Sequence, residues 1–232
     1  MSEQNKPNIV RVFIQLVIVL IVAPLLPMII SGDWGWWQGW AYALVTILSF
    51  IVSRVLVSRV HPDLIRERAR GMEAQDTKPW DKVLAPMLAF GSIFIAIVAG
   101  LDHLYGWSSA FPAWVSVAAL TVIVIGYAFS SWALIVNRFF SGTVRIQTER
   151  GHHVVTDGPY RIIRHPGYAG ALLGFVVIPL LLDSLWAFVP AVLLIIVVFV
   201  RTALEDATLQ KELPGYAEYA QKTRHRLIPG IW

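Results

Sequence analysis

Thirty-three consecutive residues, from Tyr168 to Val200, contain only one charged side chain, Asp183. As a single helix this run would be roughly 50 Å long, whereas the hydrocarbon core of a bilayer is about 30 Å thick. Pro179 and the Asp183-Ser184 pair lie near its middle, where they favour a turn. The run therefore predicts a hairpin of two membrane helices, of which the first is short.

Other long apolar runs precede this hairpin, and together they predict an all-α integral membrane protein. Charged residues make up 15% of the chain, whereas a soluble domain has roughly a quarter. The first run is followed by no small-residue cleavage site, so we interpret it as a retained helix and not a signal peptide. The chain has no cysteine, which excludes disulfides and cysteine-ligated metals. About six transmembrane segments are expected: residues 9–30, 37–57, 83–101, 113–136, 168–182 and 186–203.

Basic residues are confined to one set of connections. All 19 lie in the N-terminal tail and first turn, in residues 54–82, in 138–164, or from Arg201 onward. With six spans these regions share one face, so the positive-inside rule predicts cytoplasmic termini, and we expect the cell inner membrane. We interpret the net charge of +4 as a topology signal and not as a nucleic-acid site. The connections without Lys or Arg lie near 31–36, 102–112 and 183–185.

Three predicted cytoplasmic segments hold five of the six histidines and nearly all the charge: residues 58–82, 137–167 and 201–232. In the stretch "GPYRIIRHPGY", Gly158 and Pro159 predict a turn, and Pro166 predicts the start of a helix. Free N–H groups of that first turn, with Arg164 beside them, would suit an anion. A juxtamembrane anchor, with arginines at lipid headgroups, explains this segment equally well.

The stretch "RTALED" carries the second group of charges. Arg201 and Glu205 are four residues apart, so they share one helical face at the membrane boundary. They could be an ordinary surface ion pair worth under about 1 kcal/mol. However, the predicted hairpin returns this face to the side of Arg164 and His165. A carboxylate opposite an anion-binding helix start would suit a zwitterionic ligand with an amino acid moiety.

Taken together, "GPYRIIRHPGYAG", the hairpin, "RTALED" and "LPGYAEY" resemble the isoprenylcysteine carboxyl methyltransferase family, over roughly Gln147 to Ile228. The stretch "HPDLIRER" also resembles a cytoplasmic segment of bacterial members, which usually begins Asn-Pro-Glu-Leu. Members are integral membrane enzymes that use S-adenosylmethionine, and phospholipid N-methyltransferases share the pattern. We therefore expect a four-helix membrane region in residues 1–136. Residues 137–232 would form the cofactor-binding methyltransferase core, with a cytoplasmic loop, the hairpin and an amphipathic tail.

Carried over residue by residue, the resemblance implies which side chains contact the cofactor. Arg201 matches the position that faces the methyl acceptor, so the expected catalytic residues are Arg201 and Glu205. The acidic pair is Glu-Asp where Glu-Glu is more usual, which leaves Asp206 without an assigned role. The cofactor-binding residues implied by the resemblance are Gln147, His152, His153, Val154, Val155, Tyr160, Arg164, His165, Pro166, Gly167 and Glu205.

The chemistry of S-adenosylmethionine agrees with these residue types. Glu205 can pair with the α-amino group and Arg164 with the α-carboxylate, while Val154, Val155 and Tyr160 can pack on adenine or ribose. Tyr168 is a further cofactor-binding candidate, because aromatic faces attract cations such as a sulfonium. Methyl transfer to a carboxylate needs neither a metal nor a general base, so positioning and desolvation would carry the catalysis. Arg201 would orient an acidic acceptor whose apolar tail enters from the bilayer.

Other functions remain open at this point. A metal site of His152, His153 and His165 lacks the spacing of known helix-borne ligand pairs. The C-terminal stretch "RHRLIPGIW" is similar to the tail of membrane sterol reductases, which bind NADPH. A non-catalytic membrane scaffold with the same fold is a third possibility. Neither the acceptor, which could be a carboxylate, an amine or a thiol, nor the oligomeric state follows from the sequence.

Overall fold

The structure is a computed structural model that describes residue 14, residues 17–70 and residues 76–232. Throughout these residues the regular structure is helical, and they include no strand. The elements in chain order are the π-helix η2 (Ile18–Val22), α2 (Ala23–Ser31), α3 (Trp37–Val60), α4 (Pro62–Arg70), α5 (Asp81–Tyr105), α6 (Ala113–Val136), the 3₁₀ turns η4 (Thr148–Arg150) and η5 (Gly158–Arg161), α7 (Pro166–Leu181), α8 (Phe188–Glu212) and α9 (Tyr216–Lys222).

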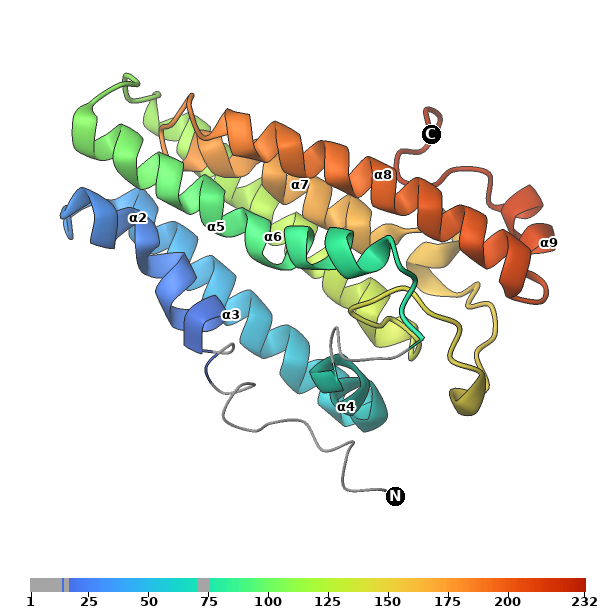
Figure 1. Cartoon of the computed structure of the whole chain (residues 1–232). Helices are drawn as coiled ribbons and strands as arrows, with labels where there is room; N and C mark the ends of the chain where they lie inside the picture. Colours follow the sequence, from blue (N-terminus) through green and yellow to red (C-terminus); the bar gives the residue numbers. More distant parts are fainter. Residues whose placement is uncertain (1–13, 15–16, 71–75) are drawn as a thin grey trace.

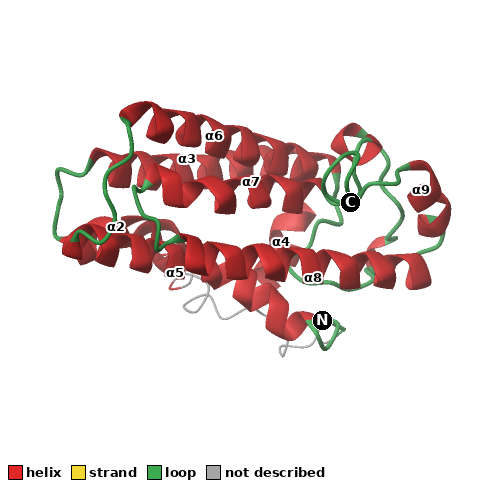
Figure 2. Ribbon diagram, turned by 90° about the horizontal axis from the view of Figure 1, so that it is seen from above, coloured by secondary structure: helices red, strands yellow, loops and turns green. Residues whose placement is uncertain are grey.

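The long helices run side by side in one bundle (Figures 1 and 2). By length and composition, α3, α5, α6 and α8 can each cross a membrane, and α2 and α7 are shorter apolar helices. The predicted all-α integral membrane fold is therefore confirmed, and the protein is a multi-pass membrane protein. Of the first predicted segment, residues 9–13 and 15–16 lie outside the described residues, and its later part forms η2 and α2.

The predicted C-terminal hairpin is present as α7 and α8, which lie side by side in Figure 1. Asp183 makes the turn with a φ of 51° and accepts hydrogen bonds from the Phe111 backbone N–H and the Gln38 side chain. The 16 residues of α7 give a length of roughly 24 Å, short of a full hydrocarbon core. In contrast, α8 continues to Glu212, past the predicted end at residue 203, because charged residues can extend a helix into water.

Small residues bring α6 and α7 into close contact. A Cβ on Gly126 would lie 2.7 Å from the backbone oxygen of Gly170, and a Cβ on Gly170 would overlap the backbone oxygen of Gly126. Ser130 donates a hydrogen bond of 2.9 Å to the carbonyl of Gly167. Such packing is typical of membrane helices, where small residues let backbones approach closely. It fixes the N-terminal end of α7, which carries several of the predicted site residues.

The three predicted cytoplasmic segments gather at one end of the bundle (Figure 1). Lys78 forms an ion pair with Glu212, and Arg145 forms one with Glu67. The opposite end is held by Asp102, whose carboxylate accepts hydrogen bonds from the hydroxyl groups of Ser108 and Ser184. The basic segments therefore share one end of the molecule.

Candidate functional site

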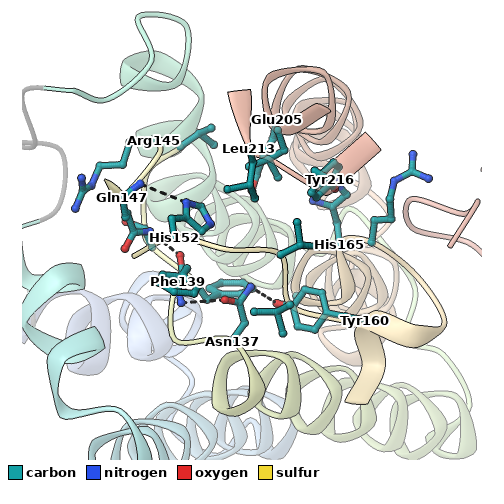
Figure 3. Close-up of a pocket in the computed structure, with 18 of the residues that line it drawn as sticks. Asn137, Phe139, Arg145, Gln147, His152, Tyr160, His165, Glu205, Leu213 and Tyr216 are labelled. Atoms are coloured by element: carbon teal, nitrogen blue, oxygen red, sulfur yellow. Dashed lines mark hydrogen bonds between the residues drawn. The ribbon is translucent and has the colours of Figure 1, made fainter. Parts of the chain in front are cut away.

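A cavity at the end of the bundle, called here the end cavity, is surrounded by the loop after α6, the start of α7, the second half of α8, and α9. In Figure 3, Gln147 and His152 lie on one side of this space, Glu205 and Leu213 on another, and Tyr160 below. Its volume is small, about 90 Å³, and it opens to solvent. Of the predicted cofactor-binding residues, all line it except Pro166: Gln147, His152, His153, Val154, Val155, Tyr160, Arg164, His165, Gly167, Tyr168 and Glu205. Pro166 is instead buried at the first position of α7.

Glu205 is the carboxylate on α8 that reaches this cavity. One of its oxygens, Oε2, accepts a 2.5 Å hydrogen bond from the hydroxyl group of Tyr168. No ion pair of Glu205 is seen in the described part of the chain. In contrast, Asp206 on α8 is paired with Arg164, and Asp81 on α5 is paired with Arg201. Glu205 is thus a half-buried negative charge that forms no ion pair with the described residues, although it attracts the nearby Arg201.

Arg201, one turn earlier on α8, does not pair with Glu205 as its spacing suggested. Its guanidinium forms two hydrogen bonds to the buried carboxylate of Asp81, at 2.6 and 3.0 Å, and a third to the carbonyl of Gly142. The same Asp81 accepts a hydrogen bond from the backbone N–H of Val144. Arg201 also lies over the ring of Tyr168, 5.3 Å from its centroid. Asp81 therefore fixes Arg201 beside Tyr168 at the inner edge of the cavity.

The sequence analysis expects Arg164 to bind the carboxylate of a ligand, but in the structure its guanidinium binds groups of the protein. Its Nε and Nη2 donate to both oxygens of Asp206, at 2.7 and 2.9 Å, and its Nη1 donates to the carbonyls of Thr223 and Arg224. Each of its three nitrogens thus has a protein partner, and the side chain is 7% exposed. Arg164 lines the cavity, but its hydrogen-bonding groups hold the C-terminal tail to α8.

Asp206, the residue without an assigned role, is the centre of a buried network. Besides Arg164, it accepts hydrogen bonds from the Tyr216 hydroxyl at 3.0 Å, the Arg226 guanidinium at 2.9 Å and the Gln210 amide at 2.8 Å. The ring of His165 lies 3.2 Å from the same carboxylate. Asp206 therefore connects the start of α7, α8, α9 and the C-terminal tail, and it holds Arg164, His165 and Tyr216, which line the end cavity.

Gln147 and His152 shape the loop side of the cavity. The buried Gln147 amide donates to the carbonyl of Phe139 at 2.7 Å, and Arg150 donates to its oxygen. The backbone N–H of Gln147 lies 3.3 Å from Nδ1 of His152. Burial lowers the pKa of His152 to about 4, so its ring is neutral near pH 7. Since Nδ1 faces a donor, the ring proton lies on Nε2, where it can be donated to a ligand.

His153 is exposed, in contrast to His152, and its Nδ1 lies 3.0 Å from the carbonyl of Gly151. Both histidine rings contact Phe139, at centroid distances of 4.7 and 4.8 Å. Among the described residues, no group of three histidine or acidic side chains is arranged to hold a metal ion. The two histidines therefore border the cavity as separate side chains.

The remaining wall is aromatic and aliphatic. Tyr160 packs in one buried cluster with Tyr216, Tyr219 and Leu213, and Val154 and Val155 pack against this cluster. The Tyr160 hydroxyl accepts a hydrogen bond of 3.1 Å from Asn137, and burial raises the pKa of this phenol above its usual value. This wall offers flat apolar surface with a few hydroxyl groups at its edge.

A second cavity, called here the inner cavity, lies between α2, α3, α5, α6, α7 and α8. Its volume is about 440 Å³, within the usual range for ligand pockets of roughly 300–1,000 Å³. Most of its lining is apolar. The residues that line both cavities are Phe140, Ser141, Gly167, Tyr168 and Arg201. The two cavities therefore meet at Tyr168 and Arg201.

The sequence interpretation missed Asp81, Asn137 and Phe139, together with Tyr216 and Tyr219 of the tail. For these residues the sequence contains one signal. Asp81 is an acid at the start of an apolar helix, where a charge needs a partner. Its partner, Arg201, lies 120 residues further along the chain, which no local pattern can identify.

Comparisons with known proteins agree with the expected resemblance. A family model described as phospholipid methyltransferase matches residues 114–214. A probable protein-S-isoprenylcysteine O-methyltransferase of Oryza sativa subsp. indica is 32% identical over 120 residues, which cover 50% of this chain and 62% of the rice protein. Protein-S-isoprenylcysteine O-methyltransferase B of Arabidopsis thaliana is 39% identical over 61 residues, 26% of this chain and 31% of that protein.

A bacterial protein is similar over a stretch of nearly the same length as the rice protein. The cobalt-zinc-cadmium resistance protein CzcN of Cupriavidus metallidurans is 32% identical over 123 residues, which cover 52% of this chain and 54% of CzcN. The matched part of the chain thus spans between 31% and 62% of the length of these relatives. The resemblance to isoprenylcysteine methyltransferases is confirmed.

Proposed function

We propose that this relative of the isoprenylcysteine methyltransferases is itself a membrane methyltransferase, which transfers a methyl group from S-adenosylmethionine to a lipophilic carboxylate. One observation carries the proposal. A cavity with both polar and apolar walls, which opens to solvent, and an apolar cavity between membrane helices meet at Tyr168 and Arg201. This arrangement suits a reaction between a water-soluble donor and an acceptor with an apolar tail.

The residues of the end cavity fit S-adenosylmethionine. Glu205, half-buried and without an ion pair among the described residues, would pair with the ammonium of the donor, and His152 would donate its Nε2 proton to a polar group. The apolar wall around Tyr160 would receive the adenine and ribose. Because Arg164 is already bound to Asp206, we assign it to the cavity wall and not to the ligand carboxylate.

S-adenosylmethionine supplies an electrophilic methyl group on a sulfonium centre. The protein's part is to hold the reacting groups together and to exclude water. The Nε and Nη2 of Arg201 are held by Asp81, which leaves Nη1 to orient an acceptor oxygen. Tyr168, held by Glu205 and Arg201, lies where the two cavities meet and presents an aromatic surface to positive charge. No residue has to act as a base if the acceptor is a carboxylate.

In the proposal, the two predicted parts of the chain, residues 1–136 and 137–232, contribute differently to the two cavities. Every lining residue of the end cavity lies within residues 137–232, the proposed methyltransferase core. The N-terminal helices contribute α2, α3 and α5 to the inner cavity. A lipid-borne acceptor would therefore be held by both parts.

The proposal is tested by calorimetric titration of the purified protein in detergent with S-adenosylmethionine and, separately, with NADPH. Saturable binding of S-adenosylmethionine alone, followed by transfer of its labelled methyl group into an extracted lipid fraction, would support a methyltransferase. Binding of NADPH alone would indicate a reductase. Binding of neither ligand, in the presence or absence of lipid extract, would indicate a scaffold.

We also propose that the protein lies in the cell inner membrane with both termini in the cytoplasm. The support is the common location of the basic segments at one end of the bundle. A reporter fused to either terminus should be active in the cytoplasm. An exported terminus would contradict the six-span arrangement.

A further inference from the structure

Two arginines at the inner cavity form no ion pair with any carboxylate that the structure describes. Arg54 lies on α3 and Arg68 on α4, and both line the cavity. In the described part of the chain no acidic side chain lies within 4 Å of either guanidinium, whereas the third arginine of this lining, Arg201, is paired with Asp81. The lining therefore carries two uncompensated positive charges.

The contacts of Arg54 leave it open to a ligand. Its Nη1 is fully buried and has no hydrogen-bond partner among the residues that the structure describes. The guanidinium lies over the ring of Phe50, 4.7 Å from the centroid. An aromatic face attracts a cation, but it cannot replace the hydrogen bonds that the buried nitrogen has lost. A buried charge in this state costs free energy unless something binds it.

Arg68 is held in place by neutral groups. Its Nη1 donates to the carbonyls of Phe140 and Ser141, at 3.0 and 3.3 Å. Burial, followed by repulsion from Arg54 and Arg201, lowers the pKa of Arg68 to about 9. All three guanidinium groups belong to residues that line the same cavity. Phe140 and Ser141 line both cavities, so Arg68 lies beside the junction at which the acceptor would react.

Among the described residues, the acids nearest to the inner cavity are engaged elsewhere. Asp81 is bonded to Arg201 and to the Val144 backbone. Glu205 faces the end cavity, where it is bonded to Tyr168. A ligand in the inner cavity can supply the missing charge, and the apolar lining requires the rest of that ligand to be apolar.

We propose that Arg54 and Arg68 bind the oxyanion headgroup of an amphiphile whose tail fills the inner cavity, and that they select an acidic methyl acceptor over a neutral or cationic one. This inference rests on the proposed function, and it assigns the charge preference to a pair of residues outside the methyltransferase core. Arg201 then orients the reacting oxygen, while Arg54 and Arg68 supply the net charge that holds the headgroup. A carboxylate and a phosphate monoester share the required chemistry.

The test compares four probes with the same C15 isoprenyl thioether tail, which end in a carboxylate, a phosphate, a carboxamide or an amine. Binding to the full-length protein in nanodiscs is measured at equilibrium. The wild type should bind the two anions at least 10-fold more tightly than the amide, and the amine least. Tighter binding of the carboxylate or of the phosphate identifies which oxyanion the site prefers.

The variants R54Q and R68Q should each reduce this preference for anions about 10-fold and leave amide binding unchanged. R59Q is the matched control, because Arg59 lies on the same helix, is exposed and does not line the cavity. R54K keeps the charge and should keep most of the preference, which provides a second variant if R54Q does not fold. A purely structural role would weaken all four probes alike.

Equal binding of amide and carboxylate by the wild type would overturn the inference, as would an unchanged preference in R54Q and R68Q. Titration with S-adenosylmethionine separates this failure from a failure of the proposed function. If the protein binds S-adenosylmethionine but shows no charge preference, only the inference is wrong. If S-adenosylmethionine does not bind at all, the proposed function is wrong.

Discussion

Replacement of Asp206 by Asn should release the C-terminal tail from the bundle. The carboxylate of Asp206 is fully buried and receives hydrogen bonds from Arg164, Tyr216, Arg226 and Gln210. Asparagine has nearly the same shape but no charge, and its amide would direct two N–H groups at these donors. The substitution therefore leaves the buried guanidinium of Arg164 without a counterion.

The size of the effect follows from this uncompensated charge. Removal of one partner from a buried ion pair typically costs about 3–5 kcal/mol. For a chain of this length, each kcal/mol lowers Tm by roughly 2–4 °C, so D206N should lower Tm by about 6–20 °C. The surface pair of Lys78 and Glu212 gives the contrast, since exposed ion pairs contribute only about 0–1 kcal/mol. E212Q should therefore change Tm by only a few degrees.

Two assays check this prediction in detergent. Thermal unfolding gives Tm for the wild type, D206N and E212Q. Limited proteolysis reports on the tail, because Arg164 and His165 also bind the backbone carbonyls of residues 223–226. D206N should be cleaved there at temperatures at which E212Q stays intact. Equal Tm values and equal cleavage for the two variants would refute the assignment of Asp206 as the centre of this network.

Three further predictions concern the end cavity and its support. E205Q keeps the hydrogen bond from Tyr168 but removes the charge proposed to hold the donor's ammonium. Calorimetry should therefore show that S-adenosylmethionine binds roughly 10- to 100-fold more weakly, while Tm stays within about 2 °C of wild type. G170A should lower stability by about 1–3 kcal/mol in thermal unfolding, because the added Cβ meets the α6 backbone, whereas G174A meets only the end of Ile178 at 3.9 Å and should be nearly neutral. Because burial lowers the pKa of His152 to about 4, the unfolded chain binds more protons than the folded one between about pH 6.5 and 4. The stability due to neutral His152 is thus present above pH 6.5 and is lost as the pH falls through this window, and the Tm of wild type, but not of H152Q, should show that loss.

Much of the fold could be predicted from the sequence because the signals for it are local. The length of an apolar run limits where a membrane helix can lie, and Asp183 in the longest run marks the turn between α7 and α8. The same reasoning predicts a membrane segment that ends at residue 203, whereas the helix itself is longer. Hydropathy reports where lipid ends, but a helix can continue into water, as α8 does to Glu212.

The members of the end cavity could also be predicted, but their partners could not. Sequence spacing suggested that Arg201 and Glu205 form a pair and that Arg164 binds a ligand carboxylate. In the structure, Arg201 is paired with Asp81 and Arg164 with Asp206. Partner choice depends on how each helix is rotated about its axis and on where distant segments return. The sequence of one helix contains neither kind of information.

The adjacent acids of α8 show how one step along a helix separates two roles. Successive residues on a helix point about 100° apart, so Glu205 and Asp206 cannot face the same neighbours. Glu205 faces the end cavity, where a charge without a partner can bind a ligand cation. Asp206 faces the C-terminal tail, where every oxygen is bonded and no ligand can reach it. A shorter side chain suits the second position, because a Glu there would push its carboxylate one methylene further into a filled network. The Glu-Asp order is therefore best understood as one acid left free for binding and one used to build the wall behind it.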